Sequence, residues 1–502
     1  MTASRNLGKI IVTGRDARKP IFIGLDFDRV ETVLTRQDLD EAADAFAHEL
    51  VGRGIPRGAR IGVLAANRPD YIVVLLGAMR AGIIPVPINY RFPPGTIAHI
   101  LADSDVKLLI CDSERRAALP PEAADIPLLC FEDENWDLVR GRFQPFDAIE
   151  PRPDEAALIL YTSGSTGRPK GVRLSHASHR WVAEVRVGEY HLEEERVLIA
   201  APLYHMNALA LSLLVCASGS TAVLLPQFKS QLYIEAIERY GCTWLTAVPP
   251  MIAMMLSEKE ALSTADLTSV RTIRMGSAPV TGQLIDQVQH VLPNARIINA
   301  YGTTEGGPVV FGAHPDGQPA PEGSVGYPHP EVTVRLAGPE RGFGTLQMRS
   351  PGMMLGYHNR PATPSPFTED GYYDTGDVFR ADAQGFYYFV GRSDDMFVSG
   401  GENIFPAEVE AVLDSSPDVL QSCVVPVEDA IKGTKPVAFV VRKPGSAISE
   451  AALKAHFLER APAFQHPRRI WFEEKLLLAP TNKIDRNALR QLAESRIAET
   501  PS

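Results

Sequence analysis

The sequence predicts an α/β protein of two unequal parts, and three observations along its 502 residues carry that prediction. Over the first two thirds, short apolar runs alternate with helical stretches, which favours α/β layers with largely parallel sheets. After about residue 315 the chain is rich in Gly and Pro with short alternating runs, which indicates a small antiparallel β unit. Near residue 390 a short α+β segment begins, so we place a domain boundary at 391–395.

The first α/β layer begins with ARIGVLAAN, which indicates a strand and its exit. The next residues, 68–82, indicate a helix that ends at Gly82, and IIPVPIN and VKLLICD indicate buried strands. STAVLLP, CTWLTAVPP, RTIRMGSA and ARIINAYG repeat the pattern. The uncharged stretch 206–227 is long enough to span a membrane. A turn at 218–220 would expose backbone to lipid, so a buried helix followed by a strand is preferred.

Composition narrows the classes of function. Hydrophobic residues make up 45% and charged residues 22% of the chain, as in an ordinary globular protein. The net charge of −11 argues against a nucleic-acid partner. The N-terminus lacks the apolar core of a signal peptide. The cysteines are scattered without metal-binding spacing, so we expect a reducing, cytoplasmic location; they are Cys111, Cys130, Cys216, Cys242 and Cys423.

The strongest chemical signal is YTSGSTGRPKGV, residues 161–172, which follows the apolar run AALIL and therefore leaves a buried strand. Its glycines let the backbone approach an anion, and its hydroxyls and lysine add donors and charge. The loop is a polyphosphate cradle, although it does not match the common P-loop spacing. A flexible linker would not need Tyr, Pro and Lys at set offsets. The groups concerned are Thr162, Ser163, Gly164, Ser165, Thr166, Gly167, Lys170 and Gly171.

Three weaker signals follow along the chain. In NAYGTTEGG, Glu305 can supply a carboxylate to Mg²⁺, Thr304 can reach a phosphate and Tyr301 offers a ring for a base. In YYDTGDVFR, Asp377 can accept hydrogen bonds from ribose hydroxyls. Taken alone, the segment NAYGTTEGG is as well explained by a strand and a turn as by a binding site. Taken alone, Asp377 is better explained as a residue that caps a turn. Lys483 of APTNKIDR would be a surface lysine by default.

These motifs and the segment GRSDDMFVSGGENIFPAEVE occur in one order along the chain. In that order the chain resembles the adenylate-forming (AMP-binding) superfamily, which contains acyl-CoA synthetases, the adenylation domains of peptide synthetases, and luciferases. The resemblance covers roughly residues 59–490 and is most specific at the phosphate loop and at GGENIFPAEVE. The chain looks most like the benzoate- and fatty-acid-type CoA ligases.

The resemblance implies a fold and a domain plan. It predicts a large N-terminal adenylation domain, residues 1–391, of two α/β subdomains and a small β-barrel. A hinge at 392–395, centred on Asp394, would join it to a mobile C-terminal α+β domain, residues 396–502. That domain would rotate between two half-reactions.

The resemblance also assigns the nucleotide site. Triphosphate would lie on the loop near Lys170, adenine against Tyr301 and the turn at 276–278, and ribose on Asp377. The predicted ATP and AMP contacts are Thr162, Ser163, Gly164, Ser165, Thr166, Lys170, Gly276, Ser277, Ala278, Asn299, Ala300, Tyr301, Gly302, Thr303, Thr304, Asp377 and Arg392. The metal site that the resemblance implies for Mg²⁺ is formed by Glu305 and Thr162.

The resemblance assigns catalysis to Lys483, Glu305 and His205. Attack of a carboxylate on the α-phosphorus builds negative charge, which an ammonium near the bridging oxygen stabilises. At ~4 Å and an effective dielectric of ~20 this interaction contributes roughly 4 kcal/mol, or about a thousandfold in rate. The superfamily usually has Gly before this lysine. Here Asn482 takes its place, and Asn is the next most tolerant residue of left-handed backbone.

For CoA, the resemblance places 399–401 along the pantetheine tunnel, where glycines let an extended chain pass close to the backbone. The CoA nucleotide would meet an aromatic and basic cluster in AFQHPRR, where His466 stands at a position usually occupied by a more basic side chain. The Trp that packs on pantetheine in some relatives is absent, and Ile431 and Lys432 stand there instead. The predicted CoA contacts are Arg91, Ser399, Gly400, Gly401, Phe464 and Arg468.

The acyl pocket is predicted beside PLYHMNAL. Amino-acid-activating relatives have an Asp where Met206 stands, and Met cannot pair with a buried ammonium. Malonate-type ligases have an Arg shortly before the YG-x-T-E motif, where this chain has Ala300. An apolar lining with small residues suits an uncharged aromatic, alicyclic or medium-chain acid. The predicted lining is Trp181, His205, Met206, Ala278, Ala300, Gly302, Gly307 and Pro308, with His205 alternatively a core histidine.

The resemblance thus implies an AMP-forming acid–thiol ligase. A carboxylate and ATP give acyl-AMP and pyrophosphate, and acyl-AMP and CoA then give acyl-CoA and AMP. The expected partners are a small carboxylic acid, ATP with Mg²⁺, and CoA, without a nucleic acid or a membrane span; a homodimer is left open. Two alternatives are transfer to a carrier-protein thiol or luciferase-like oxidation, and a non-catalytic sensor. The sensor should have lost Lys483, Glu305 or Asp377.

Overall fold

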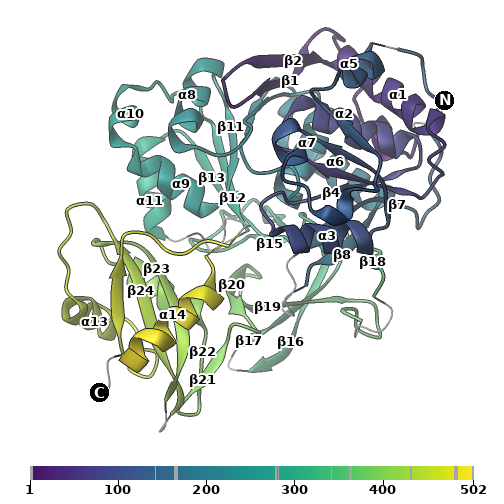
Figure 1. Ribbon diagram of the computed structural model, residues 1–502. Coiled ribbons are helices and arrows are strands. Elements are labelled where there is room, and N and C mark those ends of the chain that lie inside the picture. The colour runs from purple at the N-terminus through teal and green to yellow at the C-terminus, as the bar shows by residue number, and fades with distance from the viewer. Residues whose placement is uncertain are drawn as a thin grey trace.

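A computed structural model of the protein describes residues 4–141, 143–162, 168–277, 280, 282–340, 342–360, 365–429, 432–479 and 484–499. Two largely parallel sheets with flanking helices form a large N-terminal part, and a smaller part formed by the C-terminal strands and helices lies below it (Figure 1). The predicted mixed α/β class is confirmed. The boundary and the hinge at 392–395 stay predictions.

The largest sheet has seven strands in the order β13-β12-β11-β9-β10-β1-β2. All neighbouring strands are parallel except β1 and β2, which form an antiparallel pair at one edge. The runs TAVLLP, TWLTAVPP, RTIRMGSA and ARIINAYG supply strands of this sheet, as predicted. The strands are β1 (Pro20–Leu25), β2 (Glu31–Thr35), β9 (Arg196–Ile199), β10 (Thr221–Leu224), β11 (Trp244–Ala247), β12 (Thr272–Gly276) and β13 (Arg296–Ala300).

The second sheet has four parallel strands in the order β4-β3-β5-β6. Between β3 and β4 the chain forms the predicted helix, which starts at Pro69 because the fixed φ of proline suits the first turn. The chain turns after this helix at Gly82, whose φ is +66°. The strands are β3 (Arg60–Leu64), β4 (Ile84–Pro87), β5 (Val106–Cys111) and β6 (Leu128–Cys130).

Helices cover both sheets. The stretch 206–227 contains the predicted buried helix, which ends at Gly219 with a φ of +71°, and then β10. Within the described ranges, no helix has both the length and the apolar character needed to cross a membrane. The helices of this part are α1 (Arg36–Gly52), α2 (Pro69–Arg80), α3 (Pro94–Asp103), α4 (Ser113–Arg116), α5 (Glu134–Arg140), α6 (His176–Tyr190), α7 (Met206–Ser218), α8 (Ser230–Tyr240), α9 (Pro249–Ser257), α10 (Lys259–Thr264) and α11 (Gly282–Val291).

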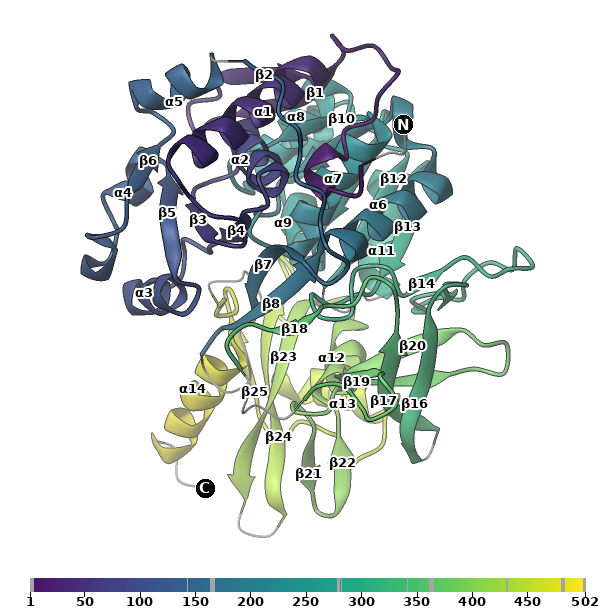
Figure 2. The same cartoon turned by 90° about the vertical axis from the view of Figure 1, so that its right-hand side faces the viewer.

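Of the antiparallel strands, β7, β8 and β18 lie between the large sheets and the C-terminal part, and β16, β17, β19 and β20 lie beside the C-terminal part (Figure 2). They form the sheets β16-β17-β19-β20, β18-β8-β7 and β14-β15, where the small β-barrel was expected. A bridge between Gly326 and Tyr387 joins the last pair to β20. The strands are β7 (Ala156–Thr162), β8 (Lys170–Ser175), β14 (Phe311–Gly312), β15 (Tyr327–Pro328), β16 (Thr333–Glu340), β17 (Phe343–Arg349), β18 (Gly356–Tyr357), β19 (Tyr373–Ala381) and β20 (Tyr387–Arg392).

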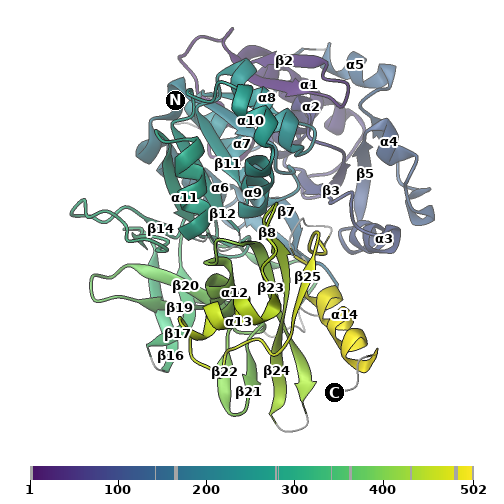
Figure 3. The same ribbon diagram turned by 90° about the vertical axis from the view of Figure 1, so that its left-hand side faces the viewer.

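The C-terminal part is built on the sheet β23-β24-β25 and carries the hairpin β21–β22 (Figure 3). Apolar side chains of α12 and α13 pack on one face of this sheet, and those of α14 on the other. Gln283 of α11 donates to the carbonyl of Ser416 at 3.3 Å and so connects the two parts. The elements are β21 (Phe397–Ser399), β22 (Glu402–Ile404), α12 (Pro406–Asp414), β23 (Val419–Asp429), β24 (Gly433–Arg442), α13 (Glu450–Leu458), β25 (Ile470–Glu473) and α14 (Arg486–Glu499).

Candidate active site

One cluster of predicted residues surrounds Glu305. The hydroxyl of Thr162 donates to Glu305 Oε1 at 3.4 Å, and the hydroxyl of Tyr357 donates to the same oxygen at 3.3 Å. Lys170 Nζ lies 5.4 Å from the centre of the Tyr357 ring. Burial raises the pKa of Glu305, and the hydroxyl hydrogen bonds only partly oppose that rise. The carboxylate of Glu305 thus lies near the two ends of the predicted phosphate loop, where Thr162 supplies a hydroxyl and Lys170 a cation.

This donor set fits Mg²⁺ only together with phosphate oxygens. The described part of the chain holds no group of three or more His, Cys, Asp or Glu that could bind a metal. Mg²⁺ typically takes one or two carboxylates and completes its shell with phosphate oxygens and water. Glu305 and Thr162 can supply the ligands that come from the protein.

Tyr357 is a contact that the sequence analysis missed. It lies on β18, which pairs with β8, and the pairing brings it to the phosphate loop from a distant part of the chain. Gly356, just before it, has a φ of +116°, so the chain turns sharply there. The only local signal was this glycine in the run MMLGYHN.

A second cluster surrounds Asp377, which lies on β19 opposite Arg392 on β20. Tyr301 donates its hydroxyl hydrogen bond to Asp377 Oδ2, and Arg392 Nη1 donates to Oδ1 at 2.9 Å. The backbone N–H of Asp377 donates to Thr375 Oγ1 at 3.0 Å. Asp377 is only 5% exposed. Its carboxylate is therefore held in place by Tyr301, directly after β13, and by Arg392 on β20.

Arg392 also reaches the predicted hinge. Its Nε donates to Asp394 Oδ1 at 2.8 Å, and this bond raises the pKa of Arg392. Burial disfavours the ionised form of Asp394, but the hydrogen bonds and charge of Arg392 outweigh burial and lower the pKa of Asp394. One guanidinium thus connects the predicted ribose residue with the predicted hinge residue.

The ends of β12 and β13 form a strip between these clusters. Gly276 lies opposite Ala300, and a Cβ at Gly276 would lie 2.6 Å from the Ala300 carbonyl oxygen. A Cβ at Gly302 would lie 2.7 Å from Pro308 Cα, so close packing requires both glycines. Residues 297–305 are all partly exposed, so this strip is open to solvent. Other predicted members of this strip are Ser277, with a φ of +66°, Asn299, Thr303 and Thr304.

Several predicted residues lie outside the described ranges, so their placement is not tested: Ser163, Gly164, Ser165, Thr166, Ala278, Ile431, Asn482 and Lys483. The ends of the segment that contains Lys483 are described, and a bridge pairs Leu478 with Ile484. The described residues between β25 and α14 lie on the side of the C-terminal part that faces β7 and β8 (Figures 2 and 3).

The predicted acyl-pocket residues that the structure describes lie on α6, at the start of α7, at the end of β13 and in the segment after β13. His205 precedes α7, and its ring lies 4.7 Å from that of Tyr204. Met206 Sδ lies 3.3 Å from Nε2 of His179, a residue that the sequence analysis did not single out. Burial lowers the pKa of His179 to about 4, so the imidazole touching Met206 is neutral at neutral pH. No charge therefore faces Met206 from this histidine.

Trp181 of α6 contacts two residues that the sequence analysis did not single out. Its Nε1 donates to Glu331 at 3.0 Å, and its ring packs against Gly352. Gly307 in turn lies against the carbonyl of Gly352, which a Cβ at Gly307 would approach to 2.8 Å. A place for Trp181 in the pocket stays a prediction.

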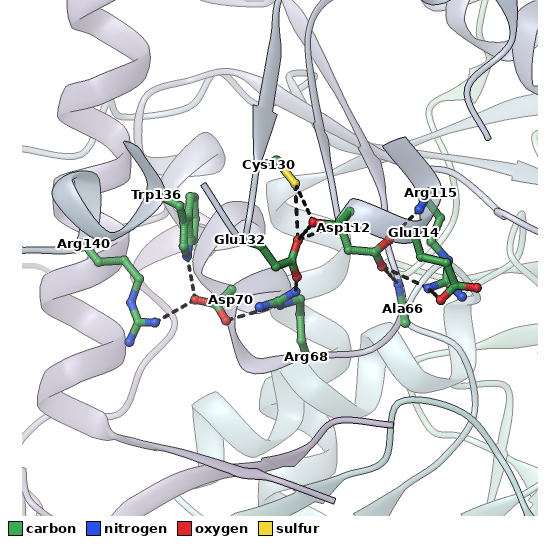
Figure 4. Close-up of polar contacts among 11 residues, drawn as sticks. Ala66, Arg68, Asp70, Asp112, Glu114, Arg115, Cys130, Glu132, Trp136 and Arg140 are labelled. Atoms are coloured by element: carbon green, nitrogen blue, oxygen red, sulfur yellow. Dashed lines mark hydrogen bonds and ion pairs between the residues drawn. The ribbon is translucent and has the colours of Figure 1, made fainter. Parts of the chain in front are cut away.

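The predicted CoA residue Arg91 follows β4, beside a network of paired charges at the carboxyl ends of β3, β5 and β6 (Figure 4). In this network Arg68 joins Asp70 to Glu132, and Asp112 pairs with Arg115. The Arg115 guanidinium lies 4.3 Å from the ring centre of Tyr90, the neighbour of Arg91. The network therefore stabilises the loop that carries Arg91. Contacts within the network also include Ala66, Glu114, Cys130, Trp136 and Arg140.

The other predicted CoA residues lie in the C-terminal part. Gly400 and Gly401 form the turn of the β21–β22 hairpin after Ser399, with φ of +60° and +88°. All three overall views show this hairpin at the end of the molecule away from the two large sheets (Figures 1 to 3). Phe464 packs against the core of the C-terminal part, and the backbone of Arg468 pairs with Pro436.

With this geometry in view, comparison with known proteins decides the family. The family described as AMP-binding enzyme matches residues 13–358, and the AMP-binding enzyme C-terminal domain matches residues 408–483. The chain belongs to the AMP-binding enzyme family. This AMP-binding enzyme is 32% identical over 475 residues to a feruloyl-CoA synthase of Amycolatopsis sp, covering 92% of this chain and 94% of the relative.

Two further proteins are similar to this AMP-binding enzyme over most of their length. A sulfoacetate–CoA ligase of Cupriavidus necator is 31% identical over 476 residues, covering 90% of this chain and 91% of the relative. The structure of ATP-bound MatB from Rhodopseudomonas palustris superposes with a TM-score of 0.87 at 26% identity, covering 98% of this chain and 99% of that one.

The family and its relatives establish the class of reaction. The protein is an ATP-dependent carboxylic acid–CoA ligase of the AMP-binding enzyme family, which forms an acyl-adenylate and transfers the acyl group to CoA. This class of reaction excludes the alternative that the protein is a non-catalytic sensor. The roles of individual residues and the identity of the acid stay open at this point.

Proposed function

We propose that this ligase activates an uncharged aromatic acid beside the partly exposed strip at the ends of β12 and β13, and that Glu305, Asp377 and Lys483 carry the nucleotide chemistry. The observation that carries the proposal is the convergence of the Glu305 and Asp377 clusters on one partly exposed strip. An apolar predicted lining supports an aromatic acid, as does the likeness to a feruloyl-CoA synthase.

In the first half-reaction the carboxylate oxygen attacks the α-phosphorus of ATP. The bond to the bridging oxygen breaks, and pyrophosphate leaves with the bonding electrons. Asp377 would accept hydrogen bonds from the ribose, while the ammonium of Lys483 would stabilise charge that builds on the α-phosphate. Mg²⁺ held by Glu305 and Thr162 would neutralise phosphate charge when bound.

In the second half-reaction the CoA thiol attacks the acyl carbon, and AMP leaves. We propose that the C-terminal domain turns about Asp394 between the two steps. In the present arrangement the segment before α14, rather than the hairpin with Gly400 and Gly401, faces β7 and β8. This arrangement suits the adenylation step.

We further propose a cytoplasmic location. In its favour, the five cysteines are free and buried, which suits a reducing compartment. Assembly into a homodimer stays a prediction without structural support of its own.

The test is a pyrophosphate-release screen over several dozen carboxylic acids, run with and without CoA. We expect release with aromatic acids, and acyl-CoA as the product once CoA is added. Release that never yields acyl-CoA would instead favour a carrier-protein thiol as the acceptor. If no aromatic acid is activated while aliphatic or anionic acids are, the proposed acid class is wrong.

A further inference from the structure

Arg115 is a buried cation that the proposed nucleotide chemistry does not use. It lies on α4, and its side chain is only 10% exposed. Its backbone N–H donates to Asp112 Oδ1 at 2.9 Å, and its Nη1 donates to Asp112 Oδ2 at 3.4 Å and to Glu114 Oε2 at 2.6 Å (Figure 4). Asp112 directly follows β5 and also accepts a hydrogen bond from the backbone N–H of Ala66, just after β3, at 2.9 Å. The guanidinium is therefore paired with acids and fixed to the carboxyl ends of two strands.

The turn that carries Arg91 packs against this guanidinium. Arg115 Cζ lies 4.3 Å from the centre of the Tyr90 ring, and Arg91 Cζ lies 5.9 Å from the centre of the same ring. Both distances are within the range of cation–π attraction, which extends to about 6 Å. The backbone N–H of Arg91 donates to Asn89 Oδ1 at 2.9 Å, which fixes the turn. One ring thus connects the buried Arg115 with Arg91, which is partly exposed.

The Tyr90 ring is also held by a second ring. It meets the ring of Tyr204 edge-on, with the two centres 5.5 Å apart, and Tyr204 is only 3% exposed. Tyr204 lies just before α7, far from Tyr90 and Arg115 in the chain. Because Arg115 and Tyr204 both hold the ring, Tyr90 gives the side chain of Arg91 a fixed surface to lie on.

We propose that Arg115 is a positioning residue for acyl transfer: through the Tyr90 ring it holds Arg91 where a phosphate of CoA can pair with it. The proposal rests on the proposed second half-reaction and on Arg91 as the predicted contact for CoA. Arg115 is buried and already paired, so it acts through Arg91 and does not touch CoA. It deepens the proposed function by naming a residue on which only the second half-reaction depends.

The physical reason is the shape of the guanidinium. A planar guanidinium can lie over a ring while its N–H groups stay paired with carboxylates, whereas an ammonium is a point charge that cannot do both equally well. A long side chain that nothing restrains loses rotamer freedom when it binds a ligand, and this loss weakens binding. Arg115 is not among the partners that hold Glu305 and Asp377, so its loss should leave adenylation intact.

The experiment compares Arg115→Met, Arg115→Lys, Arg91→Met and the double variant Arg91→Met/Arg115→Met with the parent enzyme. Arg116→Met is the matched control, because Arg116 is the next residue of α4 but has a side chain that is 52% exposed and paired with Asp133. The acid is the one with the highest kcat/KM in the pyrophosphate-release screen. Acyl-CoA formation gives the KM for CoA, and pyrophosphate release without CoA gives the rate of adenylation.

We expect Arg115→Met to raise the KM for CoA about 3–30-fold while adenylation changes by less than about twofold. Arg115→Lys, which keeps the charge and the pairing with Asp112, should show a smaller rise in the same direction. Arg91→Met should raise the KM for CoA about 10–100-fold, and the double variant should differ from Arg91→Met by less than about twofold, because Arg115 acts through Arg91. Arg116→Met should match the parent enzyme in both steps.

An unchanged KM for CoA in Arg115→Met, or an equal loss in adenylation and acyl transfer, would overturn the proposal. So would a double variant whose KM for CoA shows the product of the two single effects, since Arg115 would then act independently of Arg91. If Arg91→Met leaves the KM for CoA unchanged, Arg91 does not contact CoA and the proposal fails with it. The proposed acid class is judged by the screen alone, so its failure is distinguished from the failure of Arg115.

Discussion

The nucleotide side and the thiol side of this enzyme are built differently. On the proposed nucleotide side, Asp377 lies on β19 and is held by Tyr301, directly after β13, and by Arg392 on β20. On the thiol side, Gly400 and Gly401 form the tip of a two-stranded hairpin, and a Cβ at Gly401 would have no neighbour within 4 Å. The proposed ribose residue thus lies on a strand with two side-chain partners, whereas the proposed thiol-side glycines lie at an open hairpin tip, as a surface that moves between two steps would need.

The largest expected effect comes from removing the proposed catalytic ammonium of Lys483. Lys483→Ala should slow adenylation about a thousandfold, because one charge near the bridging oxygen is lost. It should spare acyl-CoA formation from a supplied acyl-adenylate, which the other face of the C-terminal domain would serve. Pyrophosphate release and acyl-CoA formation are measured separately, with Lys475→Ala, an exposed lysine in the same segment, as the control. Equal losses in both steps would refute this role.

A smaller effect should follow from weakening the nucleotide side. Asp377→Asn keeps the shape of the side chain but removes the charge that Arg392 pairs with. Hydrogen bonds to charged groups contribute about 1.5–3 kcal/mol, so the KM for ATP should rise about 10–100-fold. Asp382→Asn, at the far turn of the same hairpin, serves as the control. An unchanged KM for ATP would remove Asp377 from the ribose site.

On the thiol side, Gly401→Ala should act on acyl transfer alone. A residue with a Cβ at a φ of +88° costs about 1–2 kcal/mol, so acyl transfer to CoA should fall about tenfold while pyrophosphate release is unchanged. Gly445→Ala is a matched control, because Gly445 has a φ of +84° and equally open surroundings. If both variants behave alike, the hairpin tip has no special part in acyl transfer.

The smallest effect concerns stability of the C-terminal part. Asp414 Oδ1 has no hydrogen-bond partner among the described residues, and burial, reinforced by the charge of Glu410, raises the pKa of Asp414 to about 8. The folded state then holds this proton more tightly than the unfolded state, so its stabilising contribution is lost as pH rises from about 4 to 8.

Asp414→Asn should therefore raise the melting temperature by a few degrees near pH 8 and by less near pH 5. Thermal unfolding across this pH range is the measurement, and Glu459→Gln, on an exposed acid of the same part, is the control. A gain that is constant with pH would show that Asp414 does not titrate in this range.

Much of the fold was predictable because its signals are local. The runs VKLLICD and RTIRMGSA are apolar enough to specify buried strands, and Gly219 marks the end of the helix before β10. Glu305 and Asp377 could be proposed because each follows a short motif. Tyr357 could not be placed in the same way, since its only local signal is the preceding glycine, which marks a turn and not a function.

By itself, the sequence determined the α/β class, the order of the motifs and the family, because strand and helix periodicity and glycine spacing are properties of neighbouring residues. Only the tertiary structure decided that Tyr357 contacts Glu305 and that Arg392 joins Asp377 to Asp394. The reason is that strand pairing and sheet order bring together residues that are far apart in the chain. The burial of each side chain and the groups around it depend on these long-range contacts, which the residue type alone does not determine.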